Sequence, residues 1–387
     1  MATAILKVIF WVSLALAFYA YAGYPIVLWL CSRMYGRDQT APALGDQHLP
    51  SLSFVIAAHN EAAVIAERVR NLVATDYPAN RLEMIVASDG SDDGTVEIVQ
   101  GFTNPNLRVL DYRSRRGKAA VLNDAIRQAR GDVIVFSDAN TFTDPQAARR
   151  LARWFHDPSI GVACGRLILT DPATGRNVDS LYWRYETTLK RLENRLGALL
   201  GANGAIYALR RSLFRDIGND VAVDDFVIPL LTHLRTRCRL VYDAGAVAFE
   251  ESPAEFGAEF KRRSRIGAGG FQSLAILAPL LHPRHGWIAF AFWSHKVLRW
   301  TCPFWLVGAL LSSLLLIGES RFFTAAALGQ LALYAAAVAG YFVPGTGRGA
   351  RALRLTSMFA GMNVALLVGF WLWASRRQQG AWQRTAR

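Results

Sequence analysis

Four short clusters of acidic and polar side chains occur along the chain, and each could contribute oxygen atoms to a binding site. The clusters span 58–61, 88–95, 137–141 and 223–226. Loop carboxylates accept hydrogen bonds from a ribose or a base, and they are ligands for hard divalent cations that neutralise a diphosphate. A carboxylate beside a bound hydroxyl group also serves as a general base. Together the clusters suit a nucleotide donor and a hydroxyl acceptor.

Short β-branched runs precede the first three clusters and place them on a predicted sheet. These runs alternate with helical stretches, which is typical of βαβ units, an α/β fold and a largely parallel sheet. Ligands bind beyond the carboxyl ends of the strands in such sheets. The predicted strands are Ser53–Ala57, Glu83–Ala87, Leu107–Leu110 and Val133–Phe136. Between the first two strands, the predicted buried helix face comprises Val64, Ile65, Val69, Leu72 and Val73.

The third cluster predicts a pair of metal ligands. In an extended segment, side chains alternate with period two, so Asp138 and Asn140 would point the same way. Their oxygen atoms could then bind one divalent cation. Read alone, this cluster also fits a helix-capping loop, and 89–93 also fits a turn with solvated carboxylates. The ordered occurrence of all four clusters favours the functional interpretation.

Composition indicates a membrane protein rather than a nucleic-acid-binding one. The chain has 387 residues, of which 52% are hydrophobic and only 19% charged. Soluble proteins carry about 25% charged residues. The net charge is +13, but the basic residues crowd beside apolar segments, as expected at the cytosolic side of a membrane. The four cysteines are scattered and match neither a zinc site nor a disulfide framework.

The N-terminal region, 1–32, is predicted to be a transmembrane helix. Its uncharged run over 8–32 is long enough to cross about 30 Å of hydrocarbon. A cleaved signal peptide is the alternative, because Ala20–Ala22 resembles a cleavage site, but the apolar run continues beyond it. Arg33 and Arg37 follow the span, so the next domain is expected to be cytosolic.

Four further regions follow the first span. We expect a catalytic domain over 50–254, interfacial amphipathic helices over 255–299, about three transmembrane helices over 300–375 and a basic tail over 376–387. The apolar run 266–281 is broken by Gly267, Gly269, Gly270 and Pro279, which favours helices that lie at the membrane surface rather than cross it. Basic groups flank the last apolar run, 355–375, on both sides, so the side of the tail stays open.

The ordered motifs resemble the family 2 glycosyltransferases, in particular membrane-embedded members related to cellulose, chitin, hyaluronan and poly-N-acetylglucosamine synthases. The resemblance runs from about Ser51 to Phe271. It implies a GT-A-like, mostly parallel sheet with flanking helices, together with helical transmembrane and interfacial segments. It also implies metal-dependent, inverting transfer of a hexose or N-acetylhexosamine from a UDP-linked sugar. Mg²⁺ or Mn²⁺ would be the cofactor, and a growing polysaccharide or lipid-linked glycan at the inner membrane would be the acceptor.

The same resemblance assigns roles residue by residue. Asp225 matches the general base of a Thr-Glu-Asp motif, and Asp224 stands in the Glu position. The predicted nucleotide-binding residues are Ala58, Glu61, Asp89, Lys118, Asp138 and Arg265. The predicted metal ligands are Asp138 and Asn140, and the predicted acceptor residues are Gly201, Asn203, Gly204 and Arg262. Read alone, Glu61 and Lys118 also fit helix starts, and Arg262 also fits a basic face against anionic lipid.

The sequence departs from the family pattern at positions that bear on the product. Ser88 replaces a frequent first aspartate. The Gln-any-any-Arg-Trp motif of processive synthases falls on Arg262–Ile266, where only Arg265 agrees and Ile266 replaces Trp. One alternative is therefore a single addition to a polyprenyl-phosphate-type lipid carrier. A non-catalytic nucleotide-binding membrane protein is an alternative of another class, and the retained Asp225 argues against it.

Overall fold

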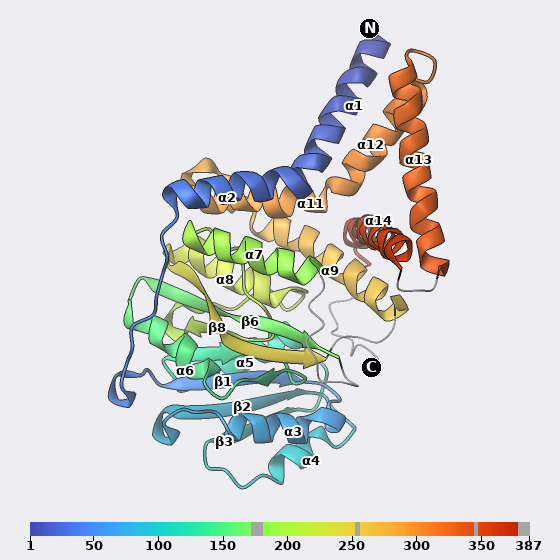
Figure 1. The fold of residues 1–387 in the computed structure, drawn as a ribbon. Helices are drawn as coiled ribbons and strands as arrows, with labels where there is room; N and C mark the ends of the chain where they lie inside the picture. The colour runs from blue at the N-terminus through green and yellow to red at the C-terminus, as the bar shows by residue number, and fades with distance from the viewer. Residues whose placement is uncertain (172–180, 252–255, 344–346, 378–387) are drawn as a thin grey trace. The chain divides into compact units, whose positions relative to one another are not determined.

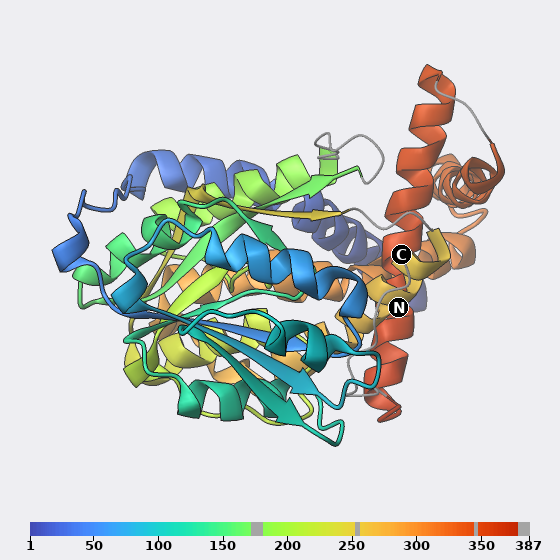
Figure 2. The same ribbon diagram turned by 90° about the horizontal axis from the view of Figure 1, so that it is seen from below.

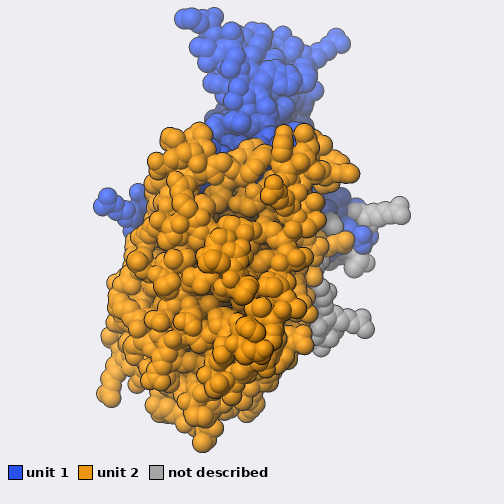
Figure 3. Space-filling view, turned by 90° about the vertical axis from the view of Figure 1, so that its left-hand side faces the viewer, with its two compact units in different colours: residues 1–27, 255–274, 292–378 blue, residues 28–254, 275–291, 379–387 orange. Residues whose placement is uncertain are grey.

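The computed structural model describes residues 1–171, 181–251, 256–343 and 347–377. The chain divides into two compact units, which Figure 3 distinguishes by colour. One unit comprises 28–254, 275–291 and 379–387 and contains the sheet. The other comprises 1–27, 255–274 and 292–378, and its described elements are helices.

The sheet has the strand order β3-β2-β1-β4-β7-β6-β8-β5 among the described residues. Its strands are β1 Leu52–Ala58, β2 Leu82–Asp89, β3 Leu107–Tyr112, β4 Val133–Phe136, β5 Phe142–Thr143, β6 Ile160–Thr170, β7 Tyr207–Arg210 and β8 Arg239–Glu251. The first four strands pair in parallel, as predicted. Strand β7 runs antiparallel to β4 and β6, whereas β6 and β8 are parallel. The sheet is therefore mixed, with a parallel N-terminal half.

Helices cover the sheet on both faces. Those of the sheet unit are α3 Ala62–Val73, α4 Thr95–Gln100, α5 Lys118–Gln128, α6 Ala147–Ala152, α7 Leu181–Arg195, α8 Asp224–Thr236 and α10 Trp287–Ala291, with short turns η2 Asp46–His48, η3 Ala79–Arg81, η4 Arg153–His156, η5 Arg211–Leu213, η6 Ala278–Leu281 and η7 Pro283–His285. Helices α3 and α4 lie over the strands β1–β3 (Figures 1 and 2). One hydrophobic core joins α3, α4 and α6 to alternate residues of β1, β2 and β4, including Phe54 and Met84. Helix α5 packs against β1 and β2, giving a layered α/β domain.

The buried face of α3 differs from the prediction at its edge. Ile65, Val69 and Leu72 are buried as expected, but Val73 is 46% exposed. Arg68 instead lies on the buried face and is fully enclosed. The face accommodates this charge because the guanidinium group of Arg68 finds hydrogen-bond acceptors inside the domain.

One row of residues crosses five strands and relates distant parts of the chain. Val55 of β1 is in register with Phe136 of β4, which is in register with Tyr207 of β7. Tyr207 in turn is in register with Cys164 of β6, and Cys164 with Tyr242 of β8. Side chains of residues in register share a face of the sheet. The row therefore runs from the parallel half to the edge of the sheet at β8.

The helical unit contains most of the apolar helices. Its elements are α1 Ala2–Phe18, η1 Tyr19–Gly23, α9 Phe256–Ile276, η8 Phe292–Val297, α11 Leu298–Trp300, α12 Cys302–Leu315, α13 Arg321–Phe342 and α14 Arg348–Ala374, and α2 Tyr24–Tyr35 continues from it into the sheet unit. Within the described residues, three helices are long and apolar enough to span a membrane: Ala2–Tyr35, Arg321–Phe342 and Gly349–Ala374. A bent pair, Trp287–Trp300 with Cys302–Leu315, gives a fourth candidate. The first predicted C-terminal span is thus a helix of 14 residues, shorter than the roughly 20 residues that a straight crossing needs.

Helix α9 passes through the glycines of the 266–281 run and ends at Ile276, before Pro279. The helix runs continuously through Gly267 and Gly270. A Cβ on Gly270 would lie 2.9 Å from the ring of Trp300, and a Cβ on Gly369 of α14 would lie 2.7 Å from the backbone nitrogen of Ala268. Small residues that admit close helix packing are common between membrane helices. The glycines therefore allow close helix packing.

Candidate active site

The predicted acidic residues of the C-terminal clusters meet near the carboxyl ends of the parallel strands. Asp138 lies two residues beyond β4, and Asp224 begins α8. The ammonium group of Lys118, the first residue of α5, lies 2.8 Å from an oxygen of Asp138 and 3.2 Å from an oxygen of Asp224. Three elements that are far apart in sequence thus converge on one lysine.

Asp225 is held against the predicted acceptor segment. The backbone N–H of Gly204 donates to its Oδ2 atom at 2.8 Å, and the N–H of Ala202 donates to its carbonyl oxygen at 2.9 Å. A Cβ on Gly204 would lie 3.2 Å from an oxygen of Asp138 and 3.4 Å from the same Oδ2 of Asp225. Gly204 therefore lies between the two carboxylates and keeps the space between them open.

Gly201 shapes the same segment through its backbone. Its φ of +76° lies in the left-handed region that L side chains rarely adopt. A Cβ at this position would also lie 2.8 Å from the ring of Phe226. Any larger residue would push the acceptor segment away from α8, so the glycine is needed for the hydrogen bonds to Asp225.

The surroundings of Asp225 raise the pKa of its carboxyl group to about 6. Removal from water contributes most, and the neighbouring negative charges of Asp224 and Asp138 add to it. The positive charges of Lys118 and Lys190 oppose the shift. At neutral pH the group is mostly ionised, yet it is a stronger base than an ordinary aspartate. Such a carboxylate is suited to accept a proton from a hydroxyl group.

Lys118 is stabilised as a cation by the same cluster. Burial alone would lower the pKa of its ammonium group, but Asp138, Asp224 and Asp225 together outweigh burial and raise the pKa. Two carboxylates contact this partly buried ammonium group and a third acts on it from further away, so the cluster keeps an excess of negative charge. An additional cation would offset that excess.

Asp89 occupies a different environment at the end of β2. Its carboxylate is fully buried and accepts two backbone N–H bonds, from Arg116 at 2.6 Å and from Gly117 at 2.9 Å. Gly117 has a φ of +91°, a value that favours glycine. A ring nitrogen of His59 lies 2.7 Å from the Asp89 carbonyl oxygen. The structure thus places Asp89 beneath the loop that leads into Lys118.

The first two clusters hold each other in place through backbone hydrogen bonds. The N–H of Glu61 donates to Thr95 at 2.9 Å, and the N–H of Ala62 donates to Asp93 at 3.0 Å. Burial would raise the pKa of Asp93, but hydrogen bonds from Thr95 and Ala62 outweigh it and lower the pKa. Ala58 is buried at the end of β1, in register with Ser88. Glu61 is also nearly buried.

The predicted geometry of Asp138 and Asn140 is wrong. The chain turns at Ala139 and Asn140 instead of running extended, and the N–H of Thr141 donates to the Asp138 carbonyl oxygen at 3.3 Å. The amide group of Asn140 donates to Glu250 of β8 at 3.1 Å, whereas Asp138 binds Lys118. The two side chains therefore have different partners, because the turn breaks the period-two alternation.

The oxygen atoms around Asp138 could contribute to binding a divalent cation. Among the described residues, no three His, Cys, Asp or Glu side chains are grouped to hold a metal. A cation that bridges a diphosphate needs only one or two protein carboxylates, because substrate oxygens and waters complete its shell. Asp138 binds Lys118 through one oxygen, and its other oxygen faces Gly204 and Asp225. This arrangement fits a cation that is held mainly by a bound nucleotide.

Three residues near the site were missed in the sequence. Lys190 of α7 donates to the amide oxygen of Asn203, and it also opposes the pKa shift of Asp225. Tyr207 stacks on Phe136 with 4.3 Å between ring centroids, and its buried hydroxyl has no hydrogen-bond partner among the described residues. Neither belongs to a motif, so no local signal identifies them.

Arg68 is the third missed residue, and here the sequence did contain a signal. It is a charge at a position of α3 that should be apolar. Its guanidinium group donates to Ser137 at 2.8 Å, and Ser137 donates to the Ala205 carbonyl oxygen at 2.7 Å. Burial lowers the pKa of Arg68 to about 9, against the opposing effect of Asp138. Arg68 thus holds the loop that carries Asp138 in place through its hydrogen bond to Ser137.

The remaining predicted residues lie elsewhere in the chain. Arg262 and Arg265 are on α9, in the helical unit, and their assignments stay predictions.

The chain is similar to known proteins in sequence and in fold. Residues 53–218 match the model of the family described as glycosyl transferase family 2. Poly-beta-1,6-N-acetyl-D-glucosamine synthase of Staphylococcus aureus (strain COL) is 28% identical over 246 residues, which cover 60% of this chain and 58% of that protein. The Staphylococcus epidermidis protein of the same name is 27% identical over 241 residues, covering 59% and 56% respectively. The match thus spans less than two thirds of these relatives' length.

A solved structure is similar over nearly the whole chain. It is a mannosyltransferase from Pyrobaculum calidifontis in complex with GDP-Man and Mn²⁺. Its TM-score is 0.70 at 20% identity, and the match covers 96% of this chain and 99% of that one. At this identity the likeness establishes a GT-A-like fold.

Proposed function

We propose that this chain, whose residues 53–218 match glycosyl transferase family 2, is a glycosyltransferase that uses Asp225 as the general base of an inverting transfer from a nucleotide sugar. The donor would be a UDP-linked hexose or N-acetylhexosamine, and the acceptor a hydroxyl group of a glycan. The observation that carries the proposal is the ionisable carboxyl group of Asp225, with its raised pKa, beside the Gly204 backbone and the Lys118 cluster.

The proposed reaction is a single displacement. The acceptor hydroxyl oxygen forms a bond to the anomeric carbon as the bond from that carbon to the diphosphate oxygen breaks. The hydroxyl proton passes to a carboxylate oxygen of Asp225, and the nucleoside diphosphate leaves with the electron pair. Attack opposite the leaving group inverts the anomeric carbon. A base of this kind typically contributes about 10²–10⁴ in rate.

The acceptor position follows from the contacts of Asp225. Gly204 donates to one oxygen of this carboxylate and so fixes its orientation. Asn203 is fixed in turn, because its amide group donates to the Gly165 carbonyl oxygen at 2.9 Å and its amide oxygen accepts from Lys190. We assign Gly201, Asn203 and Gly204 to the wall of the acceptor slot. Arg262 remains a further candidate there.

The donor position is assigned to the loops at the ends of β1, β2 and β4. Ala58 and Glu61 would line the base and ribose site, and Asp138 would face the diphosphate. Asp89 is proposed to act through the backbone, since both of its oxygens accept N–H bonds from the 116–117 loop. Lys118 is proposed to orient Asp138 and Asp224. Arg265 is the predicted diphosphate contact from α9.

A divalent cation, Mg²⁺ or Mn²⁺, would neutralise charge on the departing diphosphate when bound. Asp138 is the residue whose position fits its ligation, and Asn140 could join only if its amide oxygen faces the same cation. The mannosyltransferase with the similar fold was crystallised with Mn²⁺.

The protein is membrane-associated, because at least three of its helices are long and apolar enough to span a bilayer and its relatives are polysaccharide synthases. We propose a multi-pass inner-membrane protein with a cytosolic catalytic domain, since Arg33 and Arg37 follow the first span.

The acceptor is proposed to be a growing polysaccharide. A single addition to a polyprenyl-phosphate-type lipid is the second candidate, and Ile266 in place of the usual Trp favours it.

The test is to incubate the purified full chain in detergent with UDP- and GDP-linked sugars, with Mn²⁺, with Mg²⁺ or with EDTA, and to measure the released nucleotide. We expect release from a UDP-sugar that depends on the cation and on added acceptor. Product size then separates a polymer from one added sugar. Binding of nucleotide without any turnover across the panel would contradict the proposal and indicate a non-catalytic nucleotide-binding protein.

A further inference from the structure

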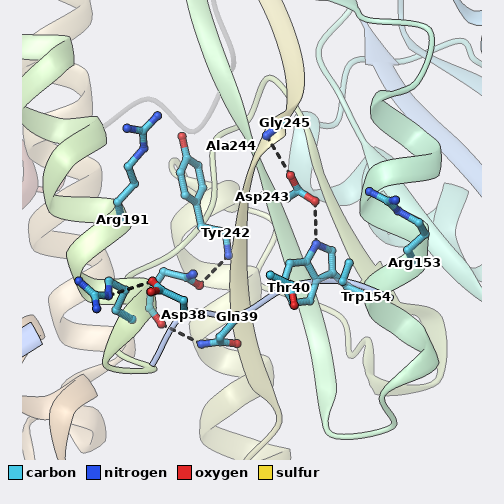
Figure 4. A pocket seen from close by; sticks show the side chains of 13 residues that line it. Asp38, Gln39, Thr40, Arg153, Trp154, Arg191, Tyr242, Asp243, Ala244 and Gly245 are labelled. Atoms are coloured by element: carbon cyan, nitrogen blue, oxygen red, sulfur yellow. Dashed lines mark hydrogen bonds and ion pairs between the residues drawn. The ribbon is translucent and has the colours of Figure 1, made fainter. Parts of the chain in front are cut away.

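A pocket of about 550 Å³ lies in the sheet unit, and none of its lining residues belongs to the candidate active site. It is lined by residues 38–41, by Arg153 and Trp154 of η4, by one side of α7 and by residues 242–245 of β8 (Figure 4). This volume lies within the range of small-molecule sites, about 300–1,000 Å³.

The pocket forms where the pairing of β8 with β6 is interrupted. Cys164 of β6 is in register with Tyr242, but the next register pair joins Arg166 to Val247. One residue of β6 therefore faces four residues of β8, which is a large bulge. Strand β5 pairs with β8 only at Ala248 and Phe249, so the bulge is at an edge of the sheet. Bulges at sheet edges frequently redirect side chains toward binding sites.

The acidic groups of the pocket already have partners. The indole N–H of Trp154 donates to one oxygen of Asp243 at 2.9 Å, and the backbone N–H of Gly245 donates to the other at 2.9 Å. Asp38 is paired with Arg195 at 3.0 Å. The side chain of Gln39 donates to the Asn194 carbonyl oxygen at 2.8 Å and fixes the 38–41 segment against α7. The pocket wall is thus preformed.

Two arginines of the pocket lack such partners. No carboxylate among the described residues lies within 4.0 Å of the guanidinium groups of Arg153 or Arg191. The Nε atom of Arg153 is buried and has no hydrogen-bond partner in the part of the chain that the structure describes. Figure 4 shows these two side chains on opposite sides of the segment that carries Tyr242. Buried donors without a partner are rare and need an explanation.

A third guanidinium group is admitted by a glycine. An Nη atom of Arg150 lies 2.6 Å from the point where a Cβ of Gly245 would be. Any side chain at position 245 would displace this arginine. Arginines of α6, η4 and α7 therefore gather at the bulge, while Asp243 and Asp38 are bound by Trp154, Gly245 and Arg195.

We propose that this pocket is a binding site for a phosphate-bearing anion. A planar carboxylate presents its two oxygens in one direction and is matched by a single guanidinium fork. A tetrahedral phosphate presents oxygens in several directions, which matches donors that come from opposite sides. Trp154 and Tyr242 supply apolar surface for the group attached to the phosphate.

The phosphate can come from two sources, a soluble phosphate or the headgroup of an anionic phospholipid. Asp38 is three residues beyond Tyr35, the end of the apolar helix that begins at Ala2. Three residues of extended chain span at most about 10 Å. The 38–41 wall is therefore close enough to the end of a membrane helix for a lipid headgroup to be reachable.

The experiment uses the full chain in nanodiscs and measures the rate at which phenylglyoxal modifies each arginine, by mass spectrometry. One arm compares phosphatidylcholine nanodiscs with nanodiscs that contain phosphatidylglycerol. The other arm adds pyrophosphate to phosphatidylcholine nanodiscs. We expect the modification of Arg191 and Arg153 to slow by at least about threefold in one arm, and that arm identifies the source. Arg235 of α8, an exposed arginine outside the pocket, is the internal control and should be unaffected.

Thr40→Trp provides a matched variant, because Thr40 lines the pocket and its replacement fills space without changing charge. We expect this variant to lose the protection, while Arg235→Gln, which removes a charge elsewhere, keeps it. Modification of Arg153 and Arg191 that slows in neither arm would overturn the proposal. Protection that persists unchanged in Thr40→Trp would also overturn it, since it would reflect general charge screening at the surface.

Discussion

Asp89 and Asp225 are both aspartates that accept backbone N–H bonds in the sheet unit, yet their surroundings are opposite. The carboxylate of Asp89 is fully buried and accepts two N–H bonds. The carboxylate of Asp225 accepts one, and two further carboxylates face it. The first arrangement satisfies its negative charge and fixes a loop. The second leaves the charge poorly satisfied, which raises the proton affinity of the group. The comparison separates a carboxylate that supports the fold from one suited to chemistry.

The largest expected effect is on turnover in Asp225→Asn. The amide cannot accept the acceptor's proton, so turnover should fall by at least about 10²-fold. Binding of the nucleotide, measured by titration of the same variant, should stay within about twofold of the wild type. Turnover close to the wild-type value would remove Asp225 from the role of base.

The stability of this variant should change in the opposite direction. The pKa of Asp225 is raised to about 6, so the folded chain binds the proton more tightly than the unfolded chain. This contribution to stability is fully present below about pH 4 and is lost as the pH rises through about 6. At pH 7 the ionised group therefore costs on the order of 3 kcal/mol of stability, because the pKa lies about 2 above its usual value of 3.8 and each unit corresponds to about 1.4 kcal/mol. Asp225→Asn should melt a few degrees higher than the wild type at pH 7, and the difference should vanish near pH 4.

Asp89→Asn is the matched substitution with the opposite expectation. One carboxylate oxygen that accepts an N–H bond is replaced by an amide group that is itself a donor. A buried N–H of Arg116 or Gly117 then lacks an acceptor, which should cost about 1–3 kcal/mol. Thermal unfolding at pH 7 measures the loss. An unchanged melting temperature would show that the two backbone bonds do not hold this loop.

A smaller effect is expected from Lys118→Gln. This ammonium group lowers the pKa of Asp225, so its removal should move the acidic limb of the pH–rate profile upward by roughly 1 unit. Lys190→Gln is the control, because Lys190 opposes the shift less than Lys118 does and should move the limb less. A larger displacement for Lys190 than for Lys118 would reverse the electrostatic ranking.

The smallest effect is expected from Tyr207→Phe. The hydroxyl of Tyr207 is buried beside the acidic cluster without a partner among the described residues, and the ring stacks on Phe136. Phenylalanine keeps the stacking and removes an unsatisfied polar group, so unfolding should change by less than about 1 kcal/mol, toward stability. A clear loss of both stability and turnover would show that the hydroxyl binds a group in the working enzyme.

The parallel half of the sheet could be predicted because each of its strands and helices is marked by a pattern of neighbouring residues in the sequence. Alternation of β-branched runs and amphipathic helices fixed the order β1, β2, β3 and β4, and hence the edge where Asp138 lies. The assignment of Lys118 and Asp225 to one active site came only from family resemblance, since nothing local links α8 to α5. The prediction that Asp138 and Asn140 point the same way was wrong. The chain turns there, and the amide group of Asn140 contacts β8, which the local pattern does not reveal.

The C-terminal half of the sheet and the pocket were not predictable. The bulge of β8 depends on register with β6, a strand distant in sequence. Arg68 could have been found, because a charge on an apolar helix face requires a buried partner. The packing role of the α9 glycines could not be predicted, because a single sequence does not show which partner helix they admit.

The most direct test of the account is an infrared pH titration of the carboxyl groups, taken as the difference between the wild-type chain and Asp225→Asn. We expect the protonated carboxyl band in this difference to disappear with a midpoint near pH 6, because the pKa of Asp225 is raised to about 6. A midpoint near pH 4, the value of an ordinary aspartate, would contradict the claim that this carboxylate is poised as a base.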